Sequence, residues 1–359
     1  MVMDRSEGPG KLSAPPTQSP STSRRYLTPL FLAAFAVLLW VLHSRIHFDW
    51  ATLVRELRHV SLIPIGIGCG SIYVCYWLRA WRWRVLLGHE SKATALSLIP
   101  AQLIGFTMVA LFGRVVDLAR PWLIARRTET PVATQLAVYS IERAFDLAAA
   151  AILFSVTLAF APHDMPNHQA FTRTGIVSSA ATLFLASFAI GVRFFGETLA
   201  KLAARLLRPF SVEMAQTVAA RILDFHQGMS VISSMKELCM ALLLSLLMWA
   251  GIAIAYMESA HAFGDTPSLA TLSVPSTMLL MAVAMGGSLF QLPVLGWFSQ
   301  IAVIAVALNR FFGTPAETAT ACGAVNLFIT TLCVVPVGLV VARLQGIGLR
   351  ETARNSNAD

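Results

Sequence analysis

Long apolar segments separated by short polar ones extend from about Tyr26 to Val341. Several of these segments contain the roughly 20 residues that an α-helix needs to cross the hydrocarbon core of a bilayer. A strand-like period of two does not recur, and the segments are too long for the strands of a membrane barrel. The pattern therefore predicts an all-α integral membrane protein, built as a polytopic helical bundle.

Six of the apolar segments are predicted to span the membrane completely. Cytoplasmic loops of membrane proteins are enriched in lysine and arginine, and Arg24 and Arg25 precede the first span. The arginine- and tryptophan-rich cluster 79–84 is expected at the inner interface, and the loops 161–170 and 258–273, which lack lysine and arginine, in the periplasm. This topology places both termini in the cytoplasm and the protein in a bacterial inner membrane. The predicted spans are 26–42, 60–78, 131–160, 174–192, 238–257 and 315–341.

Charged residues that follow the apolar segment 93–112 predict a re-entrant hairpin at this point of the chain. They occupy a stretch of fourteen residues, which is too short for a second helix to cross the membrane. A half-helix is expected to enter from the cytoplasm, to break near Gly113 and to return through 115–125. The charged residues in question are Arg114, Asp117, Arg120, Arg126 and Arg127.

A second re-entrant hairpin is predicted in the C-terminal half of the chain. The segment 274–290 enters from the periplasmic side, Pro293 and Gly296 interrupt it, and 297–312 leads out again. Proline lacks the backbone N–H that the interior of a helix requires, so a break is expected there.

The two predicted hairpins are followed by similar amino-acid sequences. Residues 125–131 and 309–315 each contain an arginine and end in a Thr-Pro pair that precedes a long span. Because the hairpins enter from opposite sides, this is the pattern of an inverted repeat, in which broken helices meet near the middle of the membrane. The alternative is a chance similarity, since proline is common at the start of helices.

Polar segments set the domain boundaries. Residues 1–23, rich in Pro, Ser, Thr and Gly, are predicted to form a disordered cytoplasmic tail. Residues 24–348 are expected to form a single membrane domain, followed by a second polar tail, 349–359. Within the membrane domain, 196–236 has leucines at helical spacing beside lysine and arginine, and is predicted to lie on the cytoplasmic leaflet as an amphipathic segment.

Composition excludes a large soluble domain. The sequence contains 13% charged residues and 56% hydrophobic ones, whereas soluble domains carry about 25% charged residues. The formal net charge of +8 is attributed to cytoplasmic loops and to attraction for anionic lipid rather than to nucleic-acid binding. The five cysteines have no metal-ligand spacing. No nucleic-acid partner, metal or cofactor is therefore predicted, and the oligomeric state stays open.

Ionisable residues within a predicted span should face a polar interior, because each costs about 2.5–3.5 kcal/mol or more at the bilayer centre. Glu142 and Asp146 are four residues apart and share one face of a helix, whereas Arg143 points elsewhere. The first hairpin would bring Arg114 and Arg120 beside the two carboxylates. Two compatible interpretations follow: a buried ion-pair network that holds the hairpin in place, or a polar path for a lipid headgroup.

Polar residues of both hairpins and of the spans that follow them form the predicted substrate path. Asn326 could equally hold helices together through a hydrogen bond. Asp117, Glu142 and Asp146 could act as acids or bases, but no nucleophile or metal ligand accompanies them, so no catalytic residue is predicted. Breaks in the path are expected at Gly113, Pro293 and Gly296. The path itself comprises Arg114, Asp117, Arg120, Glu142, Arg143, Asp146, Gln291, Ser299, Gln300 and Asn326.

Short motifs in both halves of the chain resemble those of a known family. They are Gly-Arg-Val-Val-Asp-Leu-Ala-Arg at 113–120, Glu-Arg-Ala-Phe-Asp at 142–146, Leu-Pro-Val-Leu-Gly at 292–296 and Phe-Gly-Thr-Pro at 312–315. Leu-Arg-Ala-Trp-Arg-Trp-Arg at 78–84 precedes them. In order and spacing, the motifs are similar to the lysylphosphatidylglycerol synthase transmembrane-region family, a flippase-like membrane domain, and the resemblance covers most of the chain.

The resemblance implies a membrane domain that moves phospholipids between leaflets. In the full synthases, a separate cytoplasmic domain transfers an aminoacyl group from charged tRNA, and the nine residues after Arg350 would leave no room for it here. The expected function is a flippase-like lipid translocator without enzymatic activity. Its expected partners are membrane lipids, above all an anionic phospholipid or a lipid-linked intermediate. The alternative is a non-transporting scaffold for a lipid- or glycan-modifying enzyme.

Two places depart from the family pattern. Asp117 occupies a position that usually carries glutamate, a change that keeps the charge. In the second hairpin, Val294, Leu295 and Ser299 occupy positions where glycines and a glutamate are usual. The missing acid leaves the headgroup of the substrate open.

Overall fold

The computed structural model describes residues 49–88, 92–159, 168–209, 211–228, 234–287 and 295–348. From Trp50 onward these residues belong to one compact unit. The described part of the chain consists of helices and connecting turns and contains no strand, so the predicted all-α fold class is confirmed. The first predicted span, 26–42, and the predicted tails 1–23 and 349–359 lie outside the described residues.

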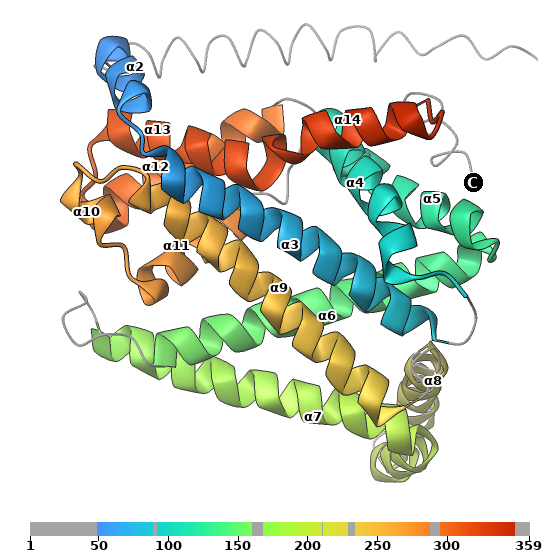
Figure 1. Cartoon of the computed structure of the whole chain (residues 1–359). Coiled ribbons are helices and arrows are strands. Elements are labelled where there is room, and N and C mark those ends of the chain that lie inside the picture. The colour runs from blue at the N-terminus through green and yellow to red at the C-terminus, as the bar shows by residue number, and fades with distance from the viewer. Residues whose placement is uncertain are drawn as a thin grey trace, which may run out of the picture. The chain divides into compact units, whose positions relative to one another are not determined.

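Helices account for nearly all of the described part of the chain (Figure 1). Most of them are joined by short turns, so that successive helices pack against each other. Their bounds are α2 Trp50–Arg58, α3 Leu62–Leu87, α4 Ala95–Phe112, η1 Arg114–Val116, α5 Ala119–Thr128, α6 Val132–Ala159, α7 His168–Leu207, α8 Val212–Gly228, α9 Met235–His261, α10 Pro267–Ala270, α11 Val274–Gly287, α12 Leu295–Phe312, α13 Ala316–Leu327, η4 Phe328–Leu332 and α14 Val334–Leu344.

Four helices in the described residues are long and apolar enough to cross a membrane. They are α3, α4, α9 and the 29-residue run Ala316–Leu344, which contains α13 and α14. The helix α6 has 28 residues, a length of about 42 Å at 1.5 Å per residue, but it carries Glu142, Arg143 and Asp146. The chain is therefore a polytopic helical membrane protein.

Small residues allow the long helices to approach each other closely. The helices α3 and α9 lie side by side (Figure 1), and Ser71 donates a hydrogen bond to the carbonyl of Gly251 at 2.7 Å. The helix α14 packs against α4 where Gly338 faces Thr107, and a Cβ atom at Gly338 would collide with the threonine side chain. Contacts of this kind are typical of helices packed within membranes.

The chain turns sharply at Gly113, the first of the predicted breaks. Gly113 has φ 78° and ψ −175°, a backbone conformation that only glycine adopts readily. The helix α4 ends directly before it, and α5 returns to pack against α4. Gly105 makes this packing possible, because a Cβ atom there would lie 2.8 Å from the Cβ of Arg120.

The helix α3 continues through the cluster 79–84 instead of leaving it at the membrane surface. Arg82 and Trp83 are only 1% and 0% exposed, so both lie in the protein interior, and the position of the cluster at the inner interface stays a prediction. Their burial has a physical reason: apolar residues resume at 85–87, and the arginine finds carboxylates in the interior.

The predicted amphipathic segment, 196–236, contains the end of α7 and the whole of α8. Phe195, directly before it, has non-helical angles (φ −124°, ψ 23°) that mark a kink in α7. Leu202 and Leu206 are exposed beside the exposed Lys201. Apolar and basic side chains thus share one stretch of surface, as an interfacial helix requires, and its place on the cytoplasmic leaflet stays a prediction.

The second predicted hairpin corresponds to α11 and α12. The residues between these helices, Gln291 and Pro293 among them, lie outside the described part of the chain. Gly296 is the second residue of α12, so the chain is helical at Gly296 and the predicted break does not fall on this residue. The re-entrant course of both hairpins and their relation as an inverted repeat stay predictions.

The final predicted span, 315–341, is not one continuous α-helix. A π turn over Phe328–Leu332 separates α13 from α14. The backbone N–H of Cys333, directly after the turn, donates to the carbonyl of Phe328, five residues earlier, at 2.8 Å. The 29-residue run Ala316–Leu344 is nevertheless long and apolar enough to cross a membrane, so the predicted span agrees with the structure and contains a π turn that the sequence did not indicate.

Candidate functional site

Two arginines and two carboxylates form an ion-pair network in the interior. Arg82 of α3 donates hydrogen bonds to Glu142 Oε1 and to Asp146 Oδ1, both at 2.6 Å. Arg120 of α5 donates through Nη1 to Glu142 Oε1 at 3.1 Å, and its Nη2 forms an ion pair with Oε2 at 2.8 Å that lacks hydrogen-bond geometry. Arg82, Arg120 and Glu142 are each 1% exposed. The network thus joins α3, α5 and α6.

Neutral groups complete the surroundings of the buried arginines. Ser245 Oγ of α9 accepts a hydrogen bond from Arg82 at 2.7 Å, and Gln102 Oε1 of α4 accepts one from Arg120 at 3.2 Å. Aromatic rings facing a guanidinium stabilise its charge, most of all where water is excluded. The guanidinium carbon of Arg120 lies 4.9–5.2 Å from the ring centroids of Trp83, Phe106 and Tyr139.

The network differs in one member from the arrangement that the sequence suggests. Arg120 meets Glu142 as expected, whereas Arg114 lies in the wall of a neighbouring cavity. The arginine that bridges Glu142 and Asp146 is Arg82, which was assigned to the interface. The apolar residues after the cluster indicate that its helix continues, and this was the signal that could have placed Arg82 inside.

A cavity of about 440 Å³ lies beside the network. Residues of α3, α4, α6, α9, α11 and α12 line it, together with the turn η1 and the π turn. Its apolar wall includes Leu147, Trp249 and Met281. Its polar wall includes Arg79, Arg114, Arg143, Asp146, Gln300, Thr330 and Thr331, and Tyr76 and Tyr256 also line the cavity.

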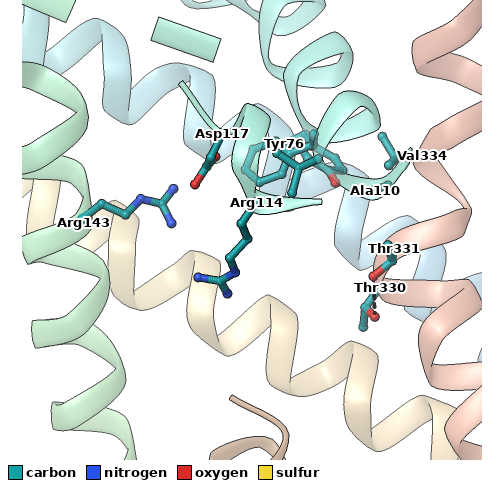
Figure 2. Close-up of a pocket in the computed structure, with 10 residues that line it drawn as sticks. Tyr76, Ala110, Arg114, Asp117, Arg143, Thr330, Thr331 and Val334 are labelled. Carbon is teal, nitrogen blue, oxygen red and sulfur yellow. Dashed lines mark hydrogen bonds between the residues drawn. The ribbon is translucent and has the colours of Figure 1, made fainter. Parts of the chain in front are cut away.

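A smaller cavity of about 170 Å³ shares part of this wall (Figure 2). Arg114, Arg143, Thr330 and Thr331 line both cavities, and Asp117 is added in the smaller one. In Figure 2, the guanidinium groups of Arg114 and Arg143 point into the same space, and the two threonines lie on its other side. The side chains come from α6, from η1 and from the π turn, so three separate parts of the chain meet here.

Arg143 connects the network with the cavities. Its side chain is 37% exposed, and its nitrogens lie 3.6 Å from Asp146 Oδ2 and 3.8 Å from Glu142 Oε2, beyond hydrogen-bonding distance. Among the described residues, its Nε and Nη2 have no hydrogen-bond acceptor. Tyr139 faces the same guanidinium at 5.0 Å and donates its hydroxyl to Asp117 Oδ2 at 2.5 Å. Arg143 therefore keeps N–H groups for a further acceptor.

The predicted path residues of the second half separate into two groups. Gln300 lines the large cavity, and its Nε2 donates to Thr330 Oγ1 at 3.2 Å. Ser299 donates to a carbonyl of its own helix at 2.9 Å. Asn326 is fully buried and donates to Ser259 Oγ of α9 at 3.0 Å, an arrangement that supports its interpretation as a link between helices.

The polar interior has an excess of positive charge. Among the described residues, no three His, Cys, Asp or Glu side chains are grouped as the ligands of a metal ion would be. The network and the two cavities contain more guanidinium groups than carboxylates, and such a site attracts anions. The guanidinium groups are those of Arg79, Arg82, Arg114, Arg120 and Arg143, and the carboxylates those of Asp117, Glu142 and Asp146.

A family profile described as the lysylphosphatidylglycerol synthase TM region matches residues 28–346 of the sequence. The chain belongs to this family. No curated protein and no solved structure matches it. The resemblance indicated by the short motifs is thus confirmed, and the network and both cavities lie within the part of the chain that corresponds to the lysylphosphatidylglycerol synthase TM region.

Proposed function

We propose that this member of the lysylphosphatidylglycerol synthase TM region family is a lipid translocator. It would move a phospholipid or a lipid-linked headgroup between the leaflets of a bacterial inner membrane. The observation that carries the proposal is the cavity of about 440 Å³, whose wall combines three arginines with apolar side chains. Membership of a family of membrane regions supports a role within the bilayer.

A headgroup that crosses a bilayer needs polar partners on its way, because charges are costly in hydrocarbon. Arg79, Arg114 and Arg143 offer such partners, and Leu147 and Trp249 offer an apolar surface for the remainder of the lipid. The cavity volume falls within the range of about 300–1,000 Å³ that is usual for pockets that bind small ligands. The site thus matches an amphiphile better than a wholly polar solute.

The buried network supports the wall of the cavity. Glu142 and Arg120 lie behind it, and Asp146 belongs to both the network and the wall. Fixed ion pairs keep the neighbouring guanidinium groups oriented while a headgroup enters and leaves. The predicted path residues that line a cavity are Arg114, Asp117, Arg143, Asp146 and Gln300.

Movement of the lipid would follow its own gradient or that of an ion, since the sequence has no nucleotide-binding motif. In this proposal both hairpins are re-entrant, and the turn at Gly113 carries Arg114 into the cavity wall. Broken helices that place polar groups at the middle of the membrane are a recurrent feature of transporters.

A second candidate function is a non-transporting scaffold for a lipid- or glycan-modifying enzyme. It is favoured by the internal pairing of the charges, because Arg82, Arg120 and Glu142 are fully buried and bind one another. A network of this kind can serve stability and fold specificity alone. The cavity would then hold a lipid as a fixed component.

Leaflet exchange of a fluorescent anionic phospholipid in proteoliposomes separates the two functions. The native protein should exchange the lipid well above protein-free vesicles, and Arg143→Gln should slow exchange about tenfold, since a hydrogen bond to a charged group contributes roughly 1.5–3 kcal/mol. Arg343→Gln, which removes an exposed arginine of α14, is the matched control and should retain the native rate. If folded native protein exchanged no headgroup tested, the scaffold would be the better account.

A further inference from the structure

We infer that Arg79, Arg114 and Arg143, together with the hydroxyl of Thr331, form a binding subsite for a phosphate group. The inference rests on the proposed function in one respect, that the phosphate belongs to a lipid headgroup. It assigns a chemical class of ligand and four donor residues to the cavities beside the charge network.

Three guanidinium groups reach the large cavity from separate elements. Arg79 comes from α3, Arg114 from the turn after Gly113, and Arg143 from α6. Arg114 and Arg143 line both cavities and direct their guanidinium groups into a common space (Figure 2). Phosphate presents oxygens in several directions, so donors that converge from different helices match it better than they match a planar carboxylate.

Arg143 is the arginine for which N–H groups available to a ligand can be identified most directly. Its distances of 3.6 Å to Asp146 and 3.8 Å to Glu142 are ion-pair contacts rather than hydrogen bonds. Its Nε and Nη2 have no acceptor among the described residues, although both atoms are buried. A buried N–H without an acceptor is unfavourable, and an anionic oxygen in the cavity would relieve it.

The π turn presents two threonines to both cavities, and they differ in what they can offer. Thr330 donates its hydroxyl hydrogen to the carbonyl of Asn326 at 2.7 Å and accepts from Gln300 at 3.2 Å. Its hydrogen is therefore committed. Thr331 Oγ1 lies 3.5 Å from Thr330 Oγ1, too far for a strong bond, so its hydrogen can turn toward a ligand. Single π turns occur often at functional sites.

The carboxylates in the cavity walls are already engaged. Asp146 accepts from Arg82 at 2.6 Å, and Asp117 accepts from Tyr139 at 2.5 Å. The excess positive charge of the interior is therefore located at the cavities, where the arginines in the walls outnumber the carboxylates. Apolar neighbours such as Trp249 limit the access of water and strengthen the attraction for an anion.

Calorimetry on the purified full chain in a neutral detergent tests the chemical class. The probes are dihexanoylphosphatidylglycerol, inorganic phosphate and dihexanoylglycerol, which lacks the phosphate. We expect the phospholipid to bind, inorganic phosphate to compete with it, and the diacylglycerol to bind at least about tenfold more weakly. Inorganic phosphate that bound as tightly as the phospholipid would keep the subsite but identify free phosphate as its ligand. If the diacylglycerol bound as tightly as the phospholipid, the subsite would be overturned. This comparison uses only the native protein, so its outcome does not depend on the folding of a variant.

A pair of threonine variants tests the assignment of the donor. Thr331→Val keeps the shape of the side chain and removes its hydroxyl, and it should weaken phospholipid binding about tenfold. Thr271→Val is the matched control, because Thr271 is exposed and its hydroxyl donates to the carbonyl of Pro267 in the preceding helix at 2.8 Å. Native affinity in a folded Thr331→Val protein would overturn the role of this hydroxyl.

The binding experiment and the exchange experiment can fail separately. Phosphate-dependent binding without leaflet exchange would support the subsite and overturn translocation. Leaflet exchange that did not distinguish lipids with phosphate from lipids without it would overturn the subsite and support translocation.

Discussion

Glu142 is the carboxylate that both fully buried arginines share. Its Oε1 accepts hydrogen bonds from Arg82 at 2.6 Å and from Arg120 at 3.1 Å. The side chains come from α6, α3 and α5, and Glu142 is 60 residues from Arg82 and 22 residues from Arg120. Because an uncompensated charge is strongly unfavourable in a low-dielectric interior, the stability of all three helices depends on this one side chain.

Replacing Glu142 with glutamine tests that dependence. Glu142→Gln leaves two guanidinium groups facing a neutral amide, and loss of one partner of a buried ion pair costs about 3–5 kcal/mol. We expect a clear decrease in the free energy of unfolding in detergent, measured by circular dichroism during denaturant titration. Glu213→Gln, at an exposed position of α8, should be close to native. Equal stability of the two variants would show that the pairing contributes little.

At the scale of residues, part of the network could be predicted from the sequence. Glu142 and Asp146 are four apart on one helix, so their common face follows from helical geometry. Arg82 could not be assigned to them, because it is separated from its partners by 60 and 64 residues. Such pairing depends on which helices pack together, and the spacing of charges along one segment contains no information on that.

Among the elements, the α4–α5 hairpin depends on the backbone at Gly113. Its φ of 78° and ψ of −175° fall in a region that side chains with a Cβ atom adopt only with strain. The residue that follows, Arg114, lines both cavities. The backbone conformation of Gly113 thus determines the position of Arg114, which is proposed to donate hydrogen bonds to the phosphate.

Gly113→Ala should therefore destabilise the hairpin by about 1–3 kcal/mol, the usual cost of such a backbone conformation for another residue. The expected result is a lower midpoint of thermal unfolding in detergent. Unfolding is measured through the fluorescence of a dye that reacts with cysteine thiols as they become exposed. Gly264→Ala is the control, since Gly264 is exposed, has no positive φ, and leaves open space for a Cβ atom. Unchanged midpoints for both variants would contradict the argument.

The two interruptions of helices differ in how visible they are in the sequence. The break at Gly113 was predictable because charged residues follow an apolar segment at once. The π turn at Phe328–Leu332 was not, since it contains no charged residue, glycine or proline that would mark an interruption of the helix. Thr330 within the turn donates to the carbonyl of Asn326 and accepts a hydrogen bond from Gln300 of another helix, a contact that depends on how the helices pack.

For the whole molecule, the predicted topology of six spans and two re-entrant hairpins leads to a direct test. Green fluorescent protein fused to either terminus should fluoresce, because both ends are predicted to be cytoplasmic. Alkaline phosphatase inserted at the exposed Gly264, in the predicted periplasmic loop, should be active. Fluorescence at one terminus only would mean that one hairpin crosses the membrane completely.

The overall architecture was the most predictable level, because segment lengths and composition depend on the bilayer rather than on particular contacts. The helices α6 and α9 begin and end within a few residues of the predicted spans 131–160 and 238–257. The cavities could not be predicted in the same way. Their walls combine residues as distant as Ile72 and Thr331, which only the packing of the helices brings together.

The pairing of Arg82 with Glu142 has a consequence for the way the protein is made. Arg82 lies in α3, the least apolar of the four candidate spans, and its partner follows 60 residues later. A ribosome therefore delivers the arginine to the bilayer before the carboxylate exists. Arg82 lies in the last turns of α3, which ends at Leu87, and there a long arginine side chain can reach the membrane surface while it has no partner. Its burial between α3 and α6 can therefore be completed only after synthesis of α6, when Glu142 becomes available to pair with it.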